Sequence, residues 1–583
     1  MVLRIANCSG FFGDRLSAAR EMVEGGPIDV LTGDYLAELT MAILWRQQRR
    51  DPDGGFAPTF LTQLEEVLGT CLDRGIKVVA NAGGLNPAGM AHKLERLAAD
   101  LGLAPKIGFV EGDNIVDRIP DLMAEGIGFA NLDTGALLAG SGVEPVTANV
   151  YLGGWGIKTA LEQGADVVIT GRVTDAAVVV GPAAWHFDWQ RDDWDALAGA
   201  VVAGHIIECG AQTTGGNYSF FGDDLGVPGF PIAEIEADGS SVITKHPGTG
   251  GEVSVGTVTA QLLYEIGPPL YLNPDVSSHF ESIGLTQEAP DRVKVSGVKG
   301  SPPPPELKVA LNYFGGYRNS MTFGIAGLDI ERKATLLEAG MWEAVGGRDQ
   351  FGWAQAHLVR SDREDPLEVD DSLAYCRFTV KDPDKDKVGK AFSRGAVELA
   401  LSSYPGLFLT SPPGDATPYA VYWPTTLPPE LAPMTVTLAT HSILVSSVPP
   451  KTANPGLVAV SSTGTSPQNG KIATERRPLG LVVGARSGDK GGNANVGLWA
   501  ISGWAYEWLQ SYLTVERLHV LLPEADGLEI DRYELPNLKA LNFVVKGLLG
   551  EGVSSSTRTD PQAKSLGEFL RAKLVDVPLD LLT

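Results

Sequence analysis

The sequence predicts an α/β protein: a large N-terminal domain with a mainly parallel sheet flanked by helices plus an α+β half, and a small C-terminal α+β domain. Three observations lead to this prediction. Up to Val180, apolar strand-like runs alternate with glycine-containing loops and amphipathic helix-like segments. Beyond Phe220, period-2 patterns typical of antiparallel strands become frequent. Residues 446–477 are rich in Pro, Ser, Thr and Gly and are expected to be a linker. The predicted parts are therefore 1–220 (parallel α/β), 221–445 (α+β), 446–477 (linker) and 478–583 (small domain).

The first part contains repeated strand–loop–helix units. Strands are expected at 3–7, 28–34, 76–84, 105–114, 149–156 and 165–172, and helices at 15–26, 35–50 and 88–102. Asn86 is expected to cap the third helix, because Pro87 then takes the first helical position. Near-continuous apolar strands indicate a parallel sheet covered on both faces, whose ligands bind at the carboxyl ends of the strands.

The later parts follow different patterns. Strands are expected at 252–266, 291–300, 307–324 and 375–382, a helix at 387–403, and an exposed proline-rich loop at 301–307. In the small domain we expect a strand at 479–483, a polar loop at 485–497, a helix at 495–510 and a strand at 519–523.

Composition and charge restrict the partners. A net charge of −25 argues against nucleic acid or an anionic membrane as the main partner, because both require a basic face. No apolar run is long enough to span a membrane, and the N-terminus lacks the pattern of a signal peptide. The cysteines are widely separated, form no C-x-x-C pair and are typical of the free thiols of a cytoplasmic protein. An anionic small molecule is still compatible with this negative net charge, because a few local cations suffice to bind it.

Several glycine-rich loops could hold such an anion. The loop ARSGDKGGNANVG, residues 485–497, combines flexibility with cations and amides, which suits ligand binding better than a packed core. The loop residues expected to contact ligand are Ser9, Gly10, Gly13, Gly83, Gly84 and Asn86. None of these loops has the G-x-G-x-x-G or P-loop spacing, and each is equally compatible with a tight strand-to-helix turn.

An Arg-x-x-Asp pattern occurs twice, as Arg172–Asp175 and as Arg486–Asp489, the second followed by Lys490. The cations could bind a carboxylate or phosphate while the aspartate moves a proton. The alternative is structural, with the aspartate capping a helix and the arginine paired to it.

A third polar segment is GHIIECGAQTTGGNYS, residues 204–219. On a helix, His205 and Glu208 would share a face. A nucleophilic pair of Cys209 and His205 is conceivable, although isolated residues of these types are more often structural. The neutral donors that follow suit the binding of a polar group; they are Gln212, Thr213, Thr214 and Asn217.

Acidic residues follow several predicted strands: Asp34, Glu111, Asp113 and Asp133. They could perform acid–base chemistry or cap helices. No metal site is expected, because the histidines are scattered and no Cys/His cluster occurs.

These segments resemble a known family. NCSGFFGDR, TGDYLAELTM, ANAGGLNP, EGDN, TGRVTDAA and HIIECGAQTTGGNYS resemble the large N-terminal domain of the acyclic terpene utilisation protein A family. ARSGDKGGNANVG and RYELPNLKALNFVVKGLLGEGVSSS resemble that family's small ferredoxin-like domain, so the chain carries both domains. The resemblance implies a role in the breakdown of acyclic terpenes such as citronellol and geraniol, through branched acyl-CoA thioesters. A hydratase or carbon–carbon lyase is the activity that it suggests.

We therefore expect a cytoplasmic enzyme of acyl-CoA catabolism, a lyase or hydratase, with a coenzyme A thioester as substrate and no required cofactor. Asp34, Asp175, Glu208 and Asp489 are the candidates for proton transfer, and Arg172 and Lys490 for stabilising negative charge. Arg486 and the segment 212–217 are expected to bind substrate. A homo-oligomer is expected, and neither nucleic acid nor a membrane as partner. The alternative is a non-catalytic acyl-CoA-binding or scaffolding subunit of a carboxylase-type assembly.

Overall fold

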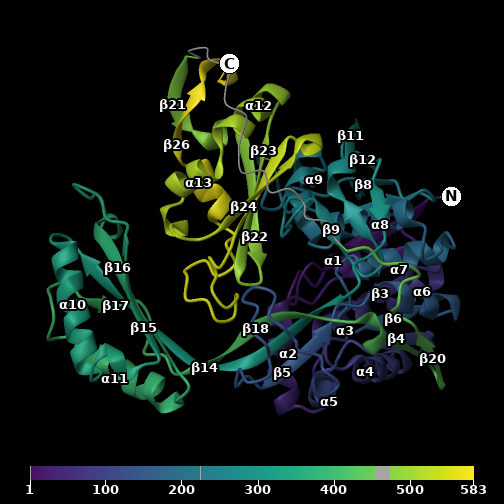
Figure 1. The fold of residues 1–583 in the computed structure, drawn as a ribbon, viewed down its shortest axis with the longest axis horizontal. Helices are drawn as coiled ribbons and strands as arrows, with labels where there is room; N and C mark the ends of the chain where they lie inside the picture. Colours follow the sequence, from purple (N-terminus) through teal and green to yellow (C-terminus); the bar gives the residue numbers. More distant parts are fainter. Residues whose placement is uncertain (1, 223–224, 455–472, 583) are drawn as a thin grey trace. The chain divides into compact units, whose positions relative to one another are not determined.

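A computed structural model of the chain describes residues 2–222, 225–454 and 473–582 (Figure 1). By compactness the chain divides into two units, one formed by residues up to Asn312 together with those from Tyr422 onward, the other by Tyr313–Val421. Residues 455–472 of the expected linker lie outside the described residues. The boundaries at 446 and 478 stay a prediction, because packing places the parts on either side of them in one unit.

The first unit is built on a large mixed sheet. Its central strands are parallel and confirm the predicted core of the fold, in the order β1 (Leu3–Asn7), β2 (Val30–Gly33), β3 (Lys77–Ala80), β6 (Val167–Thr170) and β4 (Ile107–Glu111). Antiparallel strands extend both edges: β7 (Pro231–Ile235), β8 (Ser241–Lys245), β12 (Arg292–Ser296) and β11 (Gly284–Ala289) beyond β1, and β19 (Met434–Leu438) and β20 (His441–Val445) beyond β4. The sheet is therefore parallel at its centre and antiparallel at its margins, so the prediction of a mainly parallel sheet is confirmed only in part.

Helices cover this sheet in two layers. One layer is α1 (Ala18–Glu24), α3 (Pro58–Arg74) and α4 (Pro87–Asp100), and the other is α6 (Trp155–Glu162), α7 (Ala177–His186) and α8 (Trp194–Ile207). The predicted cap of α4 is confirmed, because the Asn86 side chain accepts a 2.9 Å hydrogen bond from the Gly89 N–H. Two further helices in this part are α2 (Glu38–Arg50) and α5 (Ile119–Ala124).

Two strand predictions in this unit need correction. The strand expected at 149–156 is β5 (Pro145–Val150), which pairs with β14 rather than with the central sheet. The strand expected at 252–266 is helix α9 (Val255–Leu262), capped by Ser254. Its apolar residues Val255, Val258 and Leu262 also fit the 3.6-residue period of a helix. The N-cap at Ser254 favours this period over the two-residue period of a strand. The adjoining short strands β9 (Leu270–Leu272), β10 (Ser277–His279) and β13 (Lys299–Ser301) form a small antiparallel sheet.

The long strand β14 (Leu307–Ala326) starts in the first unit and ends in the second, and β18 (Thr417–Leu427) leads the chain back. The second unit is an antiparallel sheet with two helices. Its elements are β15 (Trp353–Arg360), β16 (Leu373–Asp382), β17 (Phe408–Leu409), α10 (Ile330–Ala344) and α11 (Phe392–Glu398). Phe323, Phe378 and Met341 belong to its apolar core. The predicted α+β character of this region is borne out.

The C-terminal part contains an antiparallel sheet in the order β22 (Val483–Lys490), β23 (Asn493–Ala500), β25 (Ala540–Val545) and β24 (Ile530–Leu535). Its helices are α12 (Gly503–Tyr512), α13 (Val515–Leu521) and α14 (Leu566–Arg571), and β21 (Thr474–Pro478) pairs with β26 (Leu574–Pro578). No helix within the described ranges is both long and apolar enough to cross a membrane.

The segment 485–497 is a β-hairpin rather than a loop. Strands β22 and β23 pair up to Lys490 and Asn493, and Gly491 and Gly492 alone make the turn. Gly491 has φ +64°, which the glycine pair of a two-residue hairpin turn readily adopts. A Cβ at Gly488 would lie 2.5 Å from the Tyr264 ring, so the small residues of β22 reflect close packing against the large domain.

Other predictions in this part are also wrong. The apolar run at 479–481 is a short 3-10 helix, and the strand begins only at Val483. The helix expected at 495–510 begins at Gly503, where Ser502 caps it, and its first half belongs to β23. The strand expected at 519–523 lies mostly in α13, which Thr514 caps. For α12 and α13 a hydroxyl cap marks the helix start that the apolar pattern alone misplaced.

Candidate functional site

A cavity of about 1860 Å³ lies where the carboxyl ends of β2 and β6 meet the β22–β23 hairpin. Its lining includes the residues that follow those strands, the segment around Tyr264 and Glu265, and the hairpin from Ala485 to Asn493. The predicted position, at the carboxyl ends of parallel strands, is where ligands bind in sheets of this kind.

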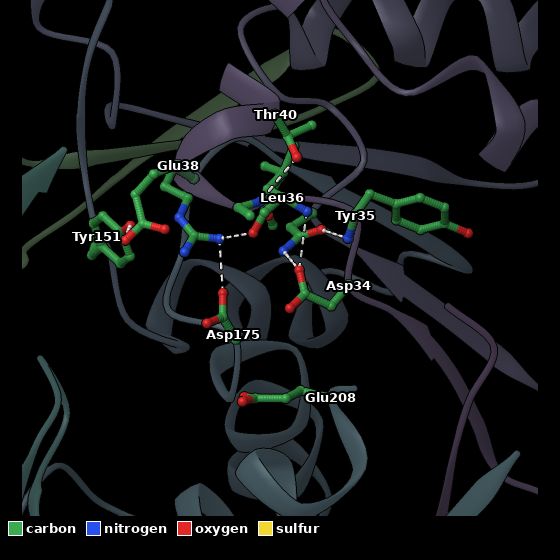
Figure 2. A network of polar contacts seen from close by, with 12 residues as sticks. Asp34, Tyr35, Leu36, Glu38, Thr40, Tyr151, Asp175 and Glu208 are labelled. Atoms are coloured by element: carbon green, nitrogen blue, oxygen red, sulfur yellow. Dashed lines mark hydrogen bonds and ion pairs between the residues drawn. The ribbon is translucent and has the colours of Figure 1, made fainter. Parts of the chain in front are cut away.

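Arg172 is buried and lies at the centre of a polar network in this cavity. Leu36, Tyr151 and Asp175 belong to this network (Figure 2). Arg172 Nη1 lies 2.7 Å from Asp175 Oδ1 and donates a 2.5 Å hydrogen bond to the Leu36 carbonyl. The guanidinium lies 4.2 Å from the centre of the Tyr151 ring. The Asp113 carboxyl accepts a 2.8 Å bond from the Arg172 N–H and so fixes the backbone beneath the side chain. The network holds one cation and one carboxylate in a defined geometry.

Two further carboxyl groups, those of Asp34 and Glu208, lie in the same region as Asp175 (Figure 2). Burial raises the pKa of both well above the ordinary range, and the charge of Asp175 raises it further. The Asp34 carboxyl also accepts hydrogen bonds from Asn81 Nδ2 (2.5 Å) and the Leu36 N–H (3.2 Å). The environment therefore favours neutral Asp34 and Glu208 beside an Asp175 carboxylate that is paired with Arg172.

His205 and Glu208 share a face at the end of α8, as their spacing predicted. His205 Nδ1 lies 3.1 Å from Glu208 Oε1. Burial lowers the pKa of His205 to about 4, which favours the neutral imidazole. Burial and the neighbouring Glu208 raise the pKa of Cys209 well above its ordinary value. A thiolate nucleophile at Cys209 is therefore disfavoured.

The C-terminal hairpin brings three more predicted residues to the cavity. Lys490 is exposed to the cavity solvent, and its Nζ donates a 3.2 Å hydrogen bond to the Glu265 carbonyl. Loss of hydration among the surrounding protein groups lowers the pKa of Lys490 to about 8, and the charge of Lys308 contributes to this shift. Burial raises the pKa of Asp489 to about 7, with Glu38 as the next cause. Arg486 donates a hydrogen bond to Gln212 Oε1.

The remaining predicted residues divide between the lining and the framework. Gly10, Gln212 and Asn217 line the cavity together with the acid–base candidates. The others lie outside the lining: Ser9, Gly13, Gly83, Gly84, Asn86, Thr213 and Thr214. Several of these have framework contacts: Asn86 caps α4, and the hydroxyls of Thr213 and Thr214 donate to backbone carbonyls.

Among the strand-end acids, Asp133 lines the cavity, where it accepts a 3.0 Å hydrogen bond from Asn493 Nδ2. Asp113, which supports Arg172, and Glu111 lie outside the lining.

Sequence reasoning missed several lining residues. Lys308 Nζ lies 3.3 Å from Glu38 Oε1, and Tyr151 donates a 3.0 Å hydrogen bond to the same carboxyl oxygen. Burial alone would raise the pKa of Glu38. The charges of Lys308 and, less strongly, Arg172 outweigh this effect and lower the pKa to about 2. Glu38 follows Asp34 by four residues, and this second acid after the strand was the available signal.

The segment at Tyr264 and Glu265 was also missed. The Glu265 N–H donates a 2.8 Å bond to Asn495 of the hairpin, and Asn495 Nδ2 donates to the Leu263 carbonyl. Asn542 of β25 donates to the carbonyls of Ile266 and Gly267. These side-chain amides dock the C-terminal sheet on the segment that lines the cavity.

Within the ranges that the structure describes, no group of His, Cys, Asp and Glu side chains is arranged to hold a metal ion. The chemistry that the side chains themselves offer is proton transfer between carboxyl groups of different charge state, next to fixed cations.

Comparison with known proteins gives two matches to protein families. Residues 3–438 match the acyclic terpene utilisation family protein AtuA, and residues 478–576 match the AtuA ferredoxin-like domain. No curated protein and no solved structure matches the chain. Because the first match covers most of the sequence and the second accounts for the C-terminal sheet, the chain belongs to the AtuA family of acyclic terpene utilisation and carries both the large domain and the ferredoxin-like domain.

Proposed function

We propose that the protein is an enzyme of acyl-CoA catabolism, a lyase or hydratase acting on a branched or hydroxylated acyl-CoA from acyclic terpene breakdown. Membership of the family supports the pathway class. The observation that carries the enzymatic proposal is the group of three carboxyls around buried Arg172, one ion-paired and two in surroundings that favour the neutral acid. Neutral carboxylic acids beside an ion-paired carboxylate are an arrangement that suits acid–base catalysis.

The division of labour follows from these surroundings. Asp175, paired with Arg172, is the base, and Glu208 is the acid. In hydration, Asp175 takes a proton from the attacking water, and Glu208 delivers one to the neighbouring carbon of the double bond. In cleavage, Asp175 takes the hydroxyl proton as the carbon–carbon bond breaks, and Glu208 protonates the carbanion that leaves. In both reactions, Lys490 stabilises the enolate oxygen that the thioester carbonyl becomes.

The size of the cavity supports a long ligand. At about 1860 Å³ it exceeds the roughly 300–1,000 Å³ of pockets for drug-sized molecules. Its lining also contains the cations Arg486, Lys490 and Lys564, which suit the phosphates of coenzyme A. A thioester could thus place its acyl end at the carboxyl cluster and its nucleotide end along the hairpin.

The test measures turnover of purified protein with branched enoyl-CoA and hydroxyacyl-CoA thioesters. Asp175→Asn and Glu208→Gln should each reduce turnover by about 100-fold or more while substrate still binds. Glu66→Gln, which alters an exposed pair with Arg20, is the matched control. Wild-type activity in both variants would refute the assignment. Tight thioester binding without turnover in the wild type would favour the alternative of a binding or scaffolding subunit.

A further inference from the structure

Arg486 is a buried cation that forms no ion pair within the part of the chain that the structure describes. Its side chain is on β22, and the residue is 7% exposed. It donates to the neutral amide oxygen of Gln212, and its guanidinium lies 4.3 Å from the Tyr264 ring centre. Among the described residues, no carboxylate forms an ion pair with it. The buried arginines Arg172 and Arg532, by contrast, have carboxylate oxygens at 2.7 Å and 2.6 Å.

An unpaired charge in a buried position is unfavourable, because the protein interior replaces the water that would solvate it. Burial accordingly lowers the pKa of Arg486, although arginine stays charged. Since Arg486 lines the cavity, an anionic ligand group could supply the missing counter-charge.

A second cation lies against the same ring. Lys564 Nζ is 4.3 Å from the Tyr264 ring centre and 3.5 Å from Glu265 Oε1. Burial raises the pKa of that carboxyl well above the ordinary range, and the nearby Asp489 raises it further. These surroundings favour the neutral acid, which offers the Lys564 ammonium little negative charge. Tyr264 thus contacts a planar guanidinium and an ammonium, and both residues line the cavity.

We propose that Arg486 and Lys564, held against Tyr264, form a subsite for an anionic group of the ligand, either a phosphate or a carboxylate. The identity of the whole ligand rests on the proposed function, whereas the subsite itself rests on the buried position of Arg486 and on its lack of an ion-pair partner among the described residues. Both cations come from the C-terminal domain and the acid–base carboxyls Asp175 and Glu208 from the N-terminal domain. One domain therefore holds the charged end of the ligand and the other its reacting end.

The experiment compares wild type, Arg486→Gln and Lys564→Gln by calorimetric titration. The ligands are inorganic phosphate, glutarate, coenzyme A, butyryl-CoA and glutaryl-CoA. Arg517→Gln is the matched control, because Arg517 also stacks on a tyrosine, at 4.9 Å from the Tyr512 ring centre, but is exposed outside the cavity. Thermal unfolding of each variant verifies the fold, and the half-buried Lys564 provides a second variant if Arg486→Gln does not fold.

Loss of a charge-assisted contact should weaken binding about 10- to 100-fold. If the subsite takes a coenzyme phosphate, Arg486→Gln weakens coenzyme A itself by this factor. If it takes a carboxylate of the acyl group, coenzyme A binds unchanged, and the variant loses the preference for glutaryl-CoA over butyryl-CoA. Unchanged affinity of both variants for every ligand would overturn the subsite. Wild-type binding of phosphate or glutarate that requires Arg486, without binding of any thioester, would overturn the proposed function and leave the subsite standing.

Discussion

Replacement of Arg172 by methionine is a direct test of how the carboxyl cluster is held. The variant keeps an unbranched side chain, shorter than that of arginine. It leaves the Asp175 carboxylate without its partner and removes both the hydrogen bond to the Leu36 carbonyl and the contact with Tyr151. Breaking a buried ion pair from one side costs about 3–5 kcal/mol. Because the Asp175 side chain is 32% exposed, water solvates part of its charge, and we expect a loss near about 3 kcal/mol.

Urea denaturation followed by tryptophan fluorescence measures this loss. Arg517→Met, at an exposed arginine, should change the free energy of unfolding by less than about 0.5 kcal/mol. The double variant Arg172→Met/Asp175→Asn also removes the unpaired Asp175 charge. Its free energy of unfolding should be higher than that of Arg172→Met by about 1 kcal/mol or more. A loss below about 1 kcal/mol for Arg172→Met, or a double variant no more stable than the single one, would refute the buried-pair argument.

Two further predictions concern the hairpin. Burial raises the pKa of Asp489 from 3.8 to about 7, so between these values the folded state binds a proton that the unfolded state releases, and stability falls as pH rises from about 4 to about 7. Asp489→Asn should flatten that part of the profile of Tm against pH, and an unchanged slope would contradict the assignment. Gly488→Val places a Cβ 2.5 Å from the Tyr264 ring and should destabilise by about 1–3 kcal/mol. Gly503→Val, where nothing lies within 4 Å, is its control, and equal Tm values for the two variants would disprove close packing at Gly488.

The sequence predicted the centre of the fold because parallel strands and their loops are local patterns. The apolar runs ending near Asp34 and Arg172 form β2 and β6, which are separated by β3 in one sheet, so the polar residues that follow them meet at its edge. Spacing alone also predicted the Arg172–Asp175 and His205–Glu208 contacts, because three residues bring side chains together after a strand or within a helix.

Other features of the site depend on tertiary packing between distant segments and could not be predicted from local sequence patterns. The polar residues of β22 predicted a ligand-binding loop, but they form a strand, and Gly488 is small because Tyr264 lies against it. The pairing of Lys308 with Glu38 joins segments far apart in the chain, and no local period indicates it. The same holds for Tyr264, whose contacts with Arg486 and Lys564 exist only once the two domains have met.

The order of the chain has a consequence for biosynthesis. Asp34, Arg172 and Glu208 leave the ribosome early, whereas Arg486, Asp489 and Lys490 follow only after most of the polypeptide has been made. At roughly 5–20 residues per second, the interval between Asp34 and Asp489 is on the order of tens of seconds. During that interval the nascent N-terminal domain lacks the wall that the hairpin supplies to the cavity. A ribosome that stops before the hairpin has been made therefore releases a chain whose cavity lacks the lining residues from Ala485 to Asn493.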